Sequence, residues 1–220
     1  MRPFASGALP VADGAALGVA MLATGFAMSF AMGPRFFALL FGYFAVTAAY
    51  SLWLKRLLII DICTLALLYS FRILAGGAAA AIPISIWLLA FSIFFFFALA
   101  AVKRQVELVD GIKSGAIKAT GRGYHVNDLP IVAQMATSAG LVAVLVLALY
   151  VNSPDVTRLY SMPETLWGIC LILLFWLNRM TLVAHRGEMH DDPVIFAVLD
   201  RTSQICFGIA AMLAIGGALL

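Results

Sequence analysis

The chain has 220 residues, of which 64% are hydrophobic and only 11% are charged, whereas about 25% of residues are charged in an ordinary soluble domain. Together with a mean hydropathy of +1.03, this composition excludes a soluble globular protein. The net charge is only +3, and the basic residues lie between apolar segments rather than in one block. We therefore expect an integral membrane protein whose partner is the lipid bilayer, and no nucleic-acid partner.

Apolar segments long enough to cross a bilayer recur along the whole chain, because about 20 apolar residues are needed for one helical span. Glycine, proline or a Lys-Arg pair separates most of them, and the connections are short. We predict seven spans, at residues 14–32, 34–54, 57–76, 83–102, 131–151, 164–184 and 203–220. The predicted fold class is an all-α polytopic membrane helix bundle, and the predicted domain organisation is one transmembrane domain over residues 1–220.

Only two connections are strongly polar. Residues 103–130 follow the fourth span, begin as a helical extension of it, and become glycine-rich near Gly121 and Gly123. Residues 185–192 read HRGEMHDD and connect the sixth and seventh spans. These two segments are where we look first for polar chemistry.

The basic residues are distributed unequally between the two membrane sides. If Arg2 is cytoplasmic, eleven of the basic residues lie on that side and only Arg35, Arg72 and Arg158 lie on the other. Cytoplasmic ends of spans carry the excess of lysine and arginine. We predict a bacterial inner-membrane protein whose N-terminus and active-site face are cytoplasmic.

Asp61 is the most informative single residue. It lies about one turn into the third span, where exposure to lipid would cost a few kcal/mol, so we predict that it faces the bundle interior. One interpretation is a structural ion pair with Lys55 or Arg56. The other is a position in a polar cavity, where Asp61 orients a lysine or a bound anion.

The HRGEMHDD segment offers three carboxylates, Glu188, Asp191 and Asp192. Carboxylate oxygens suit Mg²⁺, which commonly takes one or two carboxylates together with phosphate oxygens and water. His185 and His190 could suggest zinc, but they are five residues apart without an HExxH order, so the sequence signal for a zinc site is weak. A solvated acidic turn is an equally good interpretation of this segment.

Two Lys-Arg pairs are the natural phosphate-binding residues, Lys55-Arg56 and Lys103-Arg104, because arginine offers a planar fork and lysine a point charge. Such pairs at cytoplasmic helix ends are also ordinary topology anchors. The Gly121-Arg122-Gly123 segment lacks the Lys-Ser/Thr of a phosphate-binding P-loop and the preceding strand. We therefore expect an ordinary glycine-rich loop there.

The segments YSLWLKRLLIIDICTLALLYSFRILAGG and PISIWLLAFSIFFFFALAAVKRQVEL resemble the UbiA superfamily of intramembrane prenyltransferases. The resemblance is strongest to its decaprenyl-phosphate phosphoribosyltransferase-like branch and to UbiA domains fused to haloacid-dehalogenase-like domains. HRGEMHDDPVIFAVLDRTS resembles the region of the family's second acidic motif. RPFASG resembles the stretch that follows the first acidic motif, NDxxDxxxD.

The resemblance implies a transfer reaction on an isoprenoid substrate, either a polyprenyl diphosphate or a polyprenyl phosphate, with Mg²⁺ as cofactor. It also implies roles for named residues. Catalytic roles fall to Asp61, Lys55 and Tyr50, phosphate binding to Arg2, Arg56, Lys103 and Arg104, and metal binding to Glu188, Asp191 and Asp192.

The chain also departs from the family pattern, since family members have nine helices and the seven predicted spans match the last seven. We expect the first two helices and the NDxxDxxxD motif to be absent here, supplied by a missing N-terminal segment or a split partner. A catalytically incompetent membrane scaffold is therefore an alternative function. A transporter is a weaker alternative, because the charges concentrate at one face and no inverted repeat relates the two halves.

Overall fold

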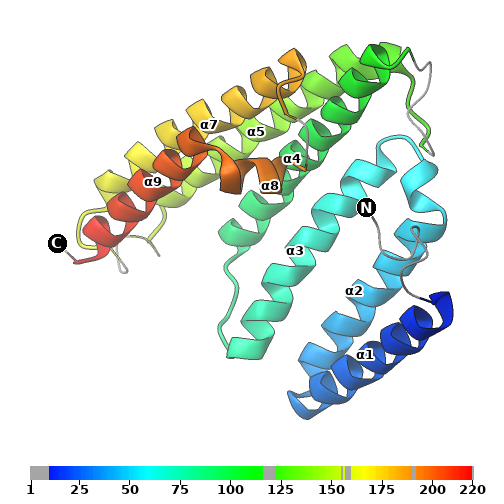
Figure 1. Ribbon diagram of the computed structural model, residues 1–220. Helices are drawn as coiled ribbons and strands as arrows, with labels where there is room; N and C mark the ends of the chain where they lie inside the picture. Colours follow the sequence, from blue (N-terminus) through cyan, green and yellow to red (C-terminus); the bar gives the residue numbers. More distant parts are fainter. Residues whose placement is uncertain (1–9, 116–121, 155, 157–159, 190–191, 220) are drawn as a thin grey trace.

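The computed structural model describes residues 10–115, 122–154, 156, 160–189 and 192–219, and these residues form helices joined by short connections (Figure 1). The α-helices are α1 (Val11–Ala31), α2 (Pro34–Leu52), α3 (Ile60–Ala80), α4 (Ile86–Lys113), α5 (Leu129–Val151), α7 (Leu166–Arg186), α8 (Pro193–Leu199) and α9 (Arg201–Leu219). Three 3-10 turns accompany them, at Leu54–Arg56, Val126–Asp128 and Pro163–Thr165.

Six of these helices are long and apolar enough to cross a membrane, and the bent pair α8 and α9 forms a seventh span if it is counted as one. The axes of α8 and α9 meet at 81°. The all-α polytopic fold is thus confirmed, and the seven predicted segments each coincide with a helix. The predicted extension of the fourth span is also confirmed, because α4 continues to Lys113.

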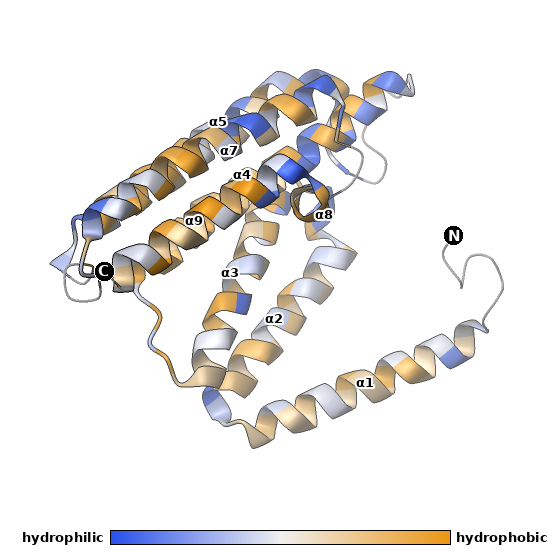
Figure 2. Ribbon diagram, turned by 60° about the vertical axis from the view of Figure 1, so that its left-hand side comes forward, coloured by the Kyte–Doolittle hydropathy of each residue, from blue (hydrophilic) through white to orange (hydrophobic). Residues whose placement is uncertain are grey.

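The best-packed part of the molecule is the group of α4, α5, α7 and α9, which lie side by side in both views (Figures 1 and 2). Small side chains line the seam between α4 and α5. Ala98 and Ala101 on α4 and Ala136, Ala139 and Gly140 on α5 are all buried. Small residues let membrane helices approach closely, and packing is what holds helices together in lipid. The central helix of the bundle is therefore α4, which also contacts α3, α7 and α8.

The first two helices form a hairpin at the edge of the molecule. α1 packs against α2, largely through phenylalanine rings, with Phe26 edge-on to Phe44 at 5.5 Å and Phe30 edge-on to Phe37 at 5.8 Å. α2 contains no buried residue. Apolar side chains that would be a liability in water are suited to contact with lipid tails or with further membrane helices.

Many hydrophilic residues gather at the helix ends, although some also lie within helices such as α3 and α7 (Figure 2). The end of α2, the start of α3, the end of α4 and the break between α8 and α9 lie on the membrane side to which the charge pattern assigns most basic residues. This arrangement brings polar side chains from four segments to one end of the bundle.

Candidate functional site

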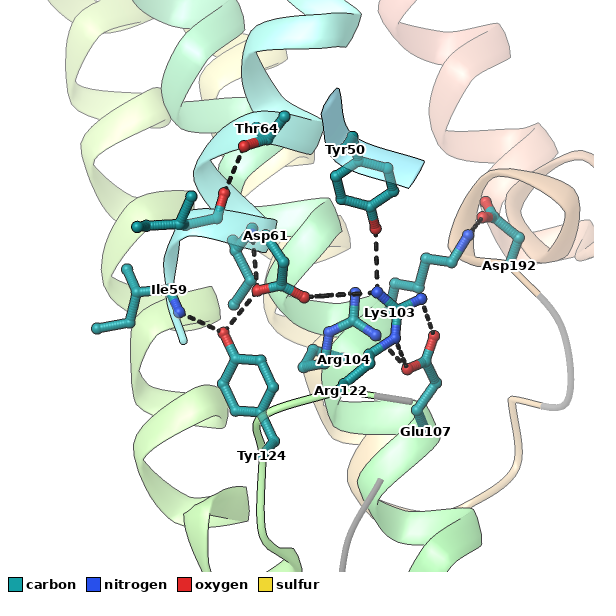
Figure 3. Close-up of polar contacts among 12 residues, drawn as sticks. Tyr50, Ile59, Asp61, Thr64, Lys103, Arg104, Glu107, Arg122, Tyr124 and Asp192 are labelled. Atoms are coloured by element: carbon teal, nitrogen blue, oxygen red, sulfur yellow. Dashed lines mark hydrogen bonds and ion pairs between the residues drawn. The ribbon is translucent and has the colours of Figure 1, made fainter. Parts of the chain in front are cut away.

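A buried ion pair forms the centre of the candidate site. Asp61 stands in the first turn of α3 and Arg104 lies on α4, and the side chains of both are fully buried. Arg104 Nη2 lies 2.9 Å from Asp61 Oδ2 (Figure 3). The two atoms are close without hydrogen-bond alignment, since neither has a hydrogen-bond partner. The predicted interior position of Asp61 is confirmed, but its principal partner is Arg104 rather than Lys55 or Arg56.

The last part of the connection between α4 and α5 packs back onto the start of α3. Tyr124 Oη donates a hydrogen bond to Asp61 Oδ1 at 2.7 Å and accepts one from the Ile59 backbone N–H at 2.8 Å. Ile59 has a φ of 65°, which is costly for a β-branched residue and persists only where the surroundings impose it. A Cβ on Gly123 would lie 2.7 Å from the Arg56 carbonyl oxygen, so glycine is required for this close approach.

Arg122 and Glu107 extend the ion pair toward the surface. Arg122 Nε lies 2.9 Å from Glu107 Oε2, and Arg122 Nη1 donates a hydrogen bond of 3.0 Å to Tyr50 Oη (Figure 3). Glu107 also pairs with Arg104 one turn earlier on α4. Side-chain exposure is 19% for Arg122 and 33% for Glu107. We call Tyr50, Asp61, Arg104, Glu107, Arg122 and Tyr124 the charged cluster.

The pKa values of the two loop residues follow from this environment. Burial lowers the pKa of Arg122, but the hydrogen bond to Tyr50 and the nearby Glu107 and Asp61 carboxylates outweigh it, and the net pKa is raised. Burial and the hydrogen bond to Asp61 raise the pKa of Tyr124. Arg122 therefore stays cationic, and Tyr124 stays a neutral hydrogen-bond donor over the whole physiological range.

Lys103 borders the cluster and faces a small apolar pocket. Its ammonium pairs with Asp192, whose other carboxylate oxygen accepts a 3.0 Å hydrogen bond from the Val194 N–H and so caps α8. The pocket lies between α3, α4 and α8, with Leu65, Tyr69 and Phe96 among its lining residues. A partly exposed cation thus stands at the mouth of an apolar, aromatic space.

The structure brings together only part of the predicted site. Tyr50, Asp61 and Arg104 belong to the charged cluster, and Lys103 and Asp192 lie beside it. Lys55 is half-buried and Arg56 exposed in the turn Leu54–Arg56, and Glu188 is exposed after the end of α7. The predictions for Arg2 and Asp191 lie outside the described residues.

The burial of Arg104 changes its predicted role. Its side chain is fully buried between Asp61 and Glu107, so a phosphate cannot reach it without a rearrangement of the cluster. We assign Arg104 a positioning role. Lys103, with 36% of its side chain exposed, and Arg122 are the accessible cations.

Sequence reasoning missed Glu107, Arg122 and Tyr124. Glu107 follows Arg104 by three residues, which places both on one face of α4, and this spacing could have identified it. Arg122 was interpreted as part of an ordinary loop, because no local pattern reveals that the chain turns back onto α3 after α4 ends. No sequence pattern identified Tyr124 as a site residue.

The described residues do not by themselves fit a magnesium site. They contain no group of three or more histidine, cysteine, aspartate or glutamate side chains that could hold a metal ion. Asp61, Glu107 and Asp192 are each already paired with a lysine or arginine. Magnesium binding by Glu188, Asp191 and Asp192 stays a prediction, and we derive no reaction step through it.

Comparison with known proteins decides the family. The model of the UbiA prenyltransferase family matches residues 1–198. The chain belongs to the UbiA prenyltransferase family. It is 36% identical over 205 residues to the nodulation protein NoeC of Azorhizobium caulinodans, a match covering 93% of this chain and 67% of NoeC. It is 34% identical over 203 residues to the y4nM protein of Sinorhizobium fredii, covering 92% of this chain but 39% of y4nM.

A third relative carries an activity in its name. The decaprenyl-phosphate phosphoribosyltransferase of Mycolicibacterium smegmatis is 26% identical over 208 residues, which cover 94% of this chain and 65% of that enzyme. The chain thus spans between two fifths and two thirds of the length of these relatives. It belongs to the UbiA family, and six of its described helices are long and apolar enough to cross a membrane.

Proposed function

We propose that this UbiA family chain transfers a phosphoribosyl group from a diphosphate donor to a polyprenyl phosphate in the membrane. The observation that supports this most directly is a partly exposed lysine, Lys103, that lines an apolar pocket at the end of the bundle that carries the charged cluster with Arg122. A polar donor needs cations, and a polyprenyl chain needs an apolar surface. The name of the phosphoribosyltransferase relative supports the same reaction.

The reaction requires no proton transfer within the site. An oxygen of the anionic lipid phosphate forms a bond to the anomeric carbon of the donor, and the bond from that carbon to the diphosphate oxygen breaks. The diphosphate leaves with the electron pair and gains negative charge as it departs. Fixed cations directed at developing charge lower such a barrier, because they need no reorganisation at the moment of reaction.

The residues of the cluster have distinct roles in this mechanism. Lys103 and Arg122 would contact the leaving diphosphate. Glu107 and Tyr50 hold the Arg122 guanidinium in place, and Asp61, Arg104 and Tyr124 fix the start of α3 against α4. This division explains why only part of the cluster reaches the surface.

A second candidate is transfer of the prenyl group itself from a polyprenyl diphosphate to an acceptor. The apolar pocket supports it, because Tyr69 and Phe96 stack there with centroids 4.9 Å apart. Both candidates place the diphosphate at Lys103 and Arg122. The membrane side also belongs to the proposal, since the excess of basic residues at this end of the bundle favours a cytoplasmic face of a bacterial inner membrane.

The test is a transfer assay on the chain in lipid nanodiscs. Undecaprenyl phosphate and labelled phosphoribosyl diphosphate should yield a labelled lipid, and Lys103→Gln should reduce the rate by about tenfold or more, since a charged hydrogen bond to the leaving group is lost. Arg186→Gln, at an exposed position at the end of α7, is the matched control and should have no effect. Prenyl transfer from undecaprenyl diphosphate, without phosphoribosyl transfer, would favour the second candidate. No transfer in either assay would contradict both.

A further inference from the structure

Arg72 is a charged residue inside a membrane-spanning helix. It lies twelve residues after the start of α3 and eight before its end, which places its Cα about 18 Å from one helix end and about 12 Å from the other. A charge at such a depth costs several kcal/mol unless it faces a partner or a wet cavity. The proposed reaction as described above does not use it.

Aromatic residues hold the Arg72 guanidinium. Its Nη2 and Nε donate to the single Tyr43 Oη, at 2.8 and 3.3 Å, and its Cζ lies 4.8 Å from the Tyr69 ring centroid. These contacts orient the guanidinium but do not neutralise it. The residue remains exposed, so part of its five-donor fork is free to bind another group.

The neighbouring helices supply no carboxylate at this depth. No aspartate or glutamate occurs between residues 14 and 60 or between residues 62 and 106, and these ranges include α2, most of α3 and the membrane-spanning part of α4. Asp61 itself is about 16 Å away along α3. By contrast, Arg179, seven residues before the end of α7, has a two-point contact with Asp200 at 2.7 and 3.0 Å.

Helical periodicity places Arg72 on the face of α3 that lines the apolar pocket. Leu65, Tyr69 and Arg72 are spaced i, i+4 and i+7 and therefore share one face, and the first two line the pocket. On α4, Phe96 and Lys103 are also seven residues apart, and both line the same pocket. Arg72 therefore lies one turn beyond Tyr69 on the pocket-lining face of α3, and Lys103 lines the same pocket from α4.

The register between α3 and α4 sets how far apart Arg72 and Lys103 lie. The contacts Asp61–Arg104 and Tyr69–Phe96 fix α3 and α4 in one antiparallel register. Long side chains on a helix point back toward its N-terminus, which for α3 is the end near Lys103 and for α4 is the opposite end. This register separates the Cα levels of Arg72 and Lys103 by about 15 Å along the helix axes.

We infer that Arg72, oriented by Tyr43 and Tyr69, binds a phosphate monoester within the membrane-embedded part of the site. This inference rests on the proposed phosphoribosyl transfer, whose two substrates both carry such a group. One is the headgroup of the polyprenyl phosphate, and the other is the phosphate at the far end of the sugar from the diphosphate. Arginine is suited to it, because its planar fork can donate two parallel hydrogen bonds to phosphate oxygens. Prenyl transfer from a diphosphate would give Arg72 no comparable ligand.

The test measures binding rather than turnover, so that it remains informative if no transfer occurs. Native mass spectrometry on the wild-type chain, Arg72→Gln and Arg72→Lys would compare undecaprenyl phosphate with undecaprenol, and phosphoribosyl diphosphate with diphosphate alone. Arg72→Gln should weaken the binding of either undecaprenyl phosphate or phosphoribosyl diphosphate by about tenfold or more. The binding of the corresponding compound without the monoester, undecaprenol or diphosphate, should not change. Arg72→Lys should retain part of the affinity, since it keeps the charge and loses the fork.

Arg35→Gln is the matched control. Arg35 is an exposed arginine in the same half of the bundle, in a groove between α2 and α3 away from the Tyr69 face, and its loss should not change either affinity. If Arg72→Gln does not fold, Tyr43→Phe removes the orienting hydroxyl and should weaken the same ligand to a smaller extent.

The pattern of outcomes identifies the ligand. Weakened undecaprenyl phosphate assigns Arg72 to the lipid headgroup, and weakened phosphoribosyl diphosphate assigns it to the sugar phosphate. Equal binding by wild type, Arg72→Gln and Arg35→Gln would overturn the inference, even if transfer is observed. Weakened binding without any transfer would instead uphold the phosphate site and contradict the proposed function.

Discussion

Two groups of buried charges occur at the polar end of the bundle, and they are built differently. The charged cluster joins α2, α3, α4 and the segment before α5. The second group, which we call the bend cluster, consists of Arg179, Asp200, Ser203 and Trp176 at the 81° break between α8 and α9. Both pair arginine with aspartate, but they differ in how completely their hydrogen-bonding groups are used.

In the bend cluster, both carboxylate oxygens of Asp200 accept hydrogen bonds. Both oxygens of Asp200 accept from Arg179, and Oδ2 also accepts from the Ser203 N–H at 2.8 Å and from Ser203 Oγ at 2.7 Å. Trp176 Nε1 donates to Ser203 Oγ at 2.9 Å. Asp200 thereby caps the first turn of α9 and ties it to α7. A joint with this geometry stabilises the bend.

The charged cluster retains unused capacity. Arg104 Nε and Nη2 and Asp61 Oδ2 are buried without a hydrogen-bond partner among the described residues, and Glu107 is shared between two arginines. Buried polar groups nearly always have a hydrogen-bond partner in folded proteins. We therefore expect substitutions in the charged cluster to affect transfer as well as stability, and substitutions in the bend cluster to affect stability alone.

Asp61→Asn should give the largest loss of stability. It keeps the shape of the side chain but breaks the buried ion pair with Arg104, whose charge is then balanced only by the partly exposed Glu107. Removing one partner of a buried ion pair costs about 3–5 kcal/mol. Thermal or denaturant unfolding in detergent would measure this loss. Asp110→Asn, at an exposed position on α4, is the control and should change stability little. Equal losses of stability in the two variants would show that the buried Asp61–Arg104 pair does not stabilise the fold.

Arg179→Gln should cost less, about 1–3 kcal/mol. Asp200 would keep its hydrogen bonds to Ser203, and 15% of its side chain is exposed to solvent. The same unfolding measurement applies, together with the transfer assay. We expect the transfer rate of the folded protein to be preserved, and a selective loss of transfer would place the bend cluster in the catalytic machinery.

Arg122→Gln should lower the transfer rate more than it lowers stability, which is the reverse of the effect expected for Arg179→Gln. We expect transfer to fall by about tenfold, equivalent to about 1.4 kcal/mol, because an accessible cation is lost from the leaving-group site. Unfolding should change less than in Asp61→Asn, since Arg122 is partly exposed. Arg122→Lys keeps the charge but cannot bridge Glu107 and Tyr50, so its transfer rate should lie between those of the wild type and Arg122→Gln. Full activity in Arg122→Gln would exclude a role for this residue in the reaction.

Gly187→Ala tests the contact that connects the ends of α4 and α7. Gly187 has a φ of 67° and its carbonyl oxygen accepts a 2.8 Å hydrogen bond from Lys113 Nζ. A methyl group would both strain the backbone and meet the Lys113 side chain. We expect the free energy of unfolding to fall by about 1 kcal/mol. Gly18→Ala in α1, where nothing lies near the added methyl group, is the control and should not lower stability, since alanine is the better helix former.

Much of the site could be anticipated from single residues, but its connections could not. Asp61 was expected inside the bundle because an aspartate one turn into an apolar span is costly against lipid. Its partner was expected in the nearby Lys55-Arg56 pair, whereas Arg104 is the residue that α4 brings to the same level. Local sequence separation is a poor guide to pairing when two antiparallel helices place distant residues side by side.

The amino-acid sequence by itself determined the membrane-spanning architecture, the polar end of the bundle and the resemblance to the family. Each follows from properties that are additive along a chain, namely hydropathy over about 20 residues, charge at span ends and short motifs. Only the packing of the helices brings Glu107, Arg122 and Tyr124 to Asp61, and places the face of α3 that carries Tyr69 beside Phe96 and Lys103 of α4. These facts depend on the register between α3 and α4 and on the path of the chain before α5, which are set by packing between elements rather than by any one segment.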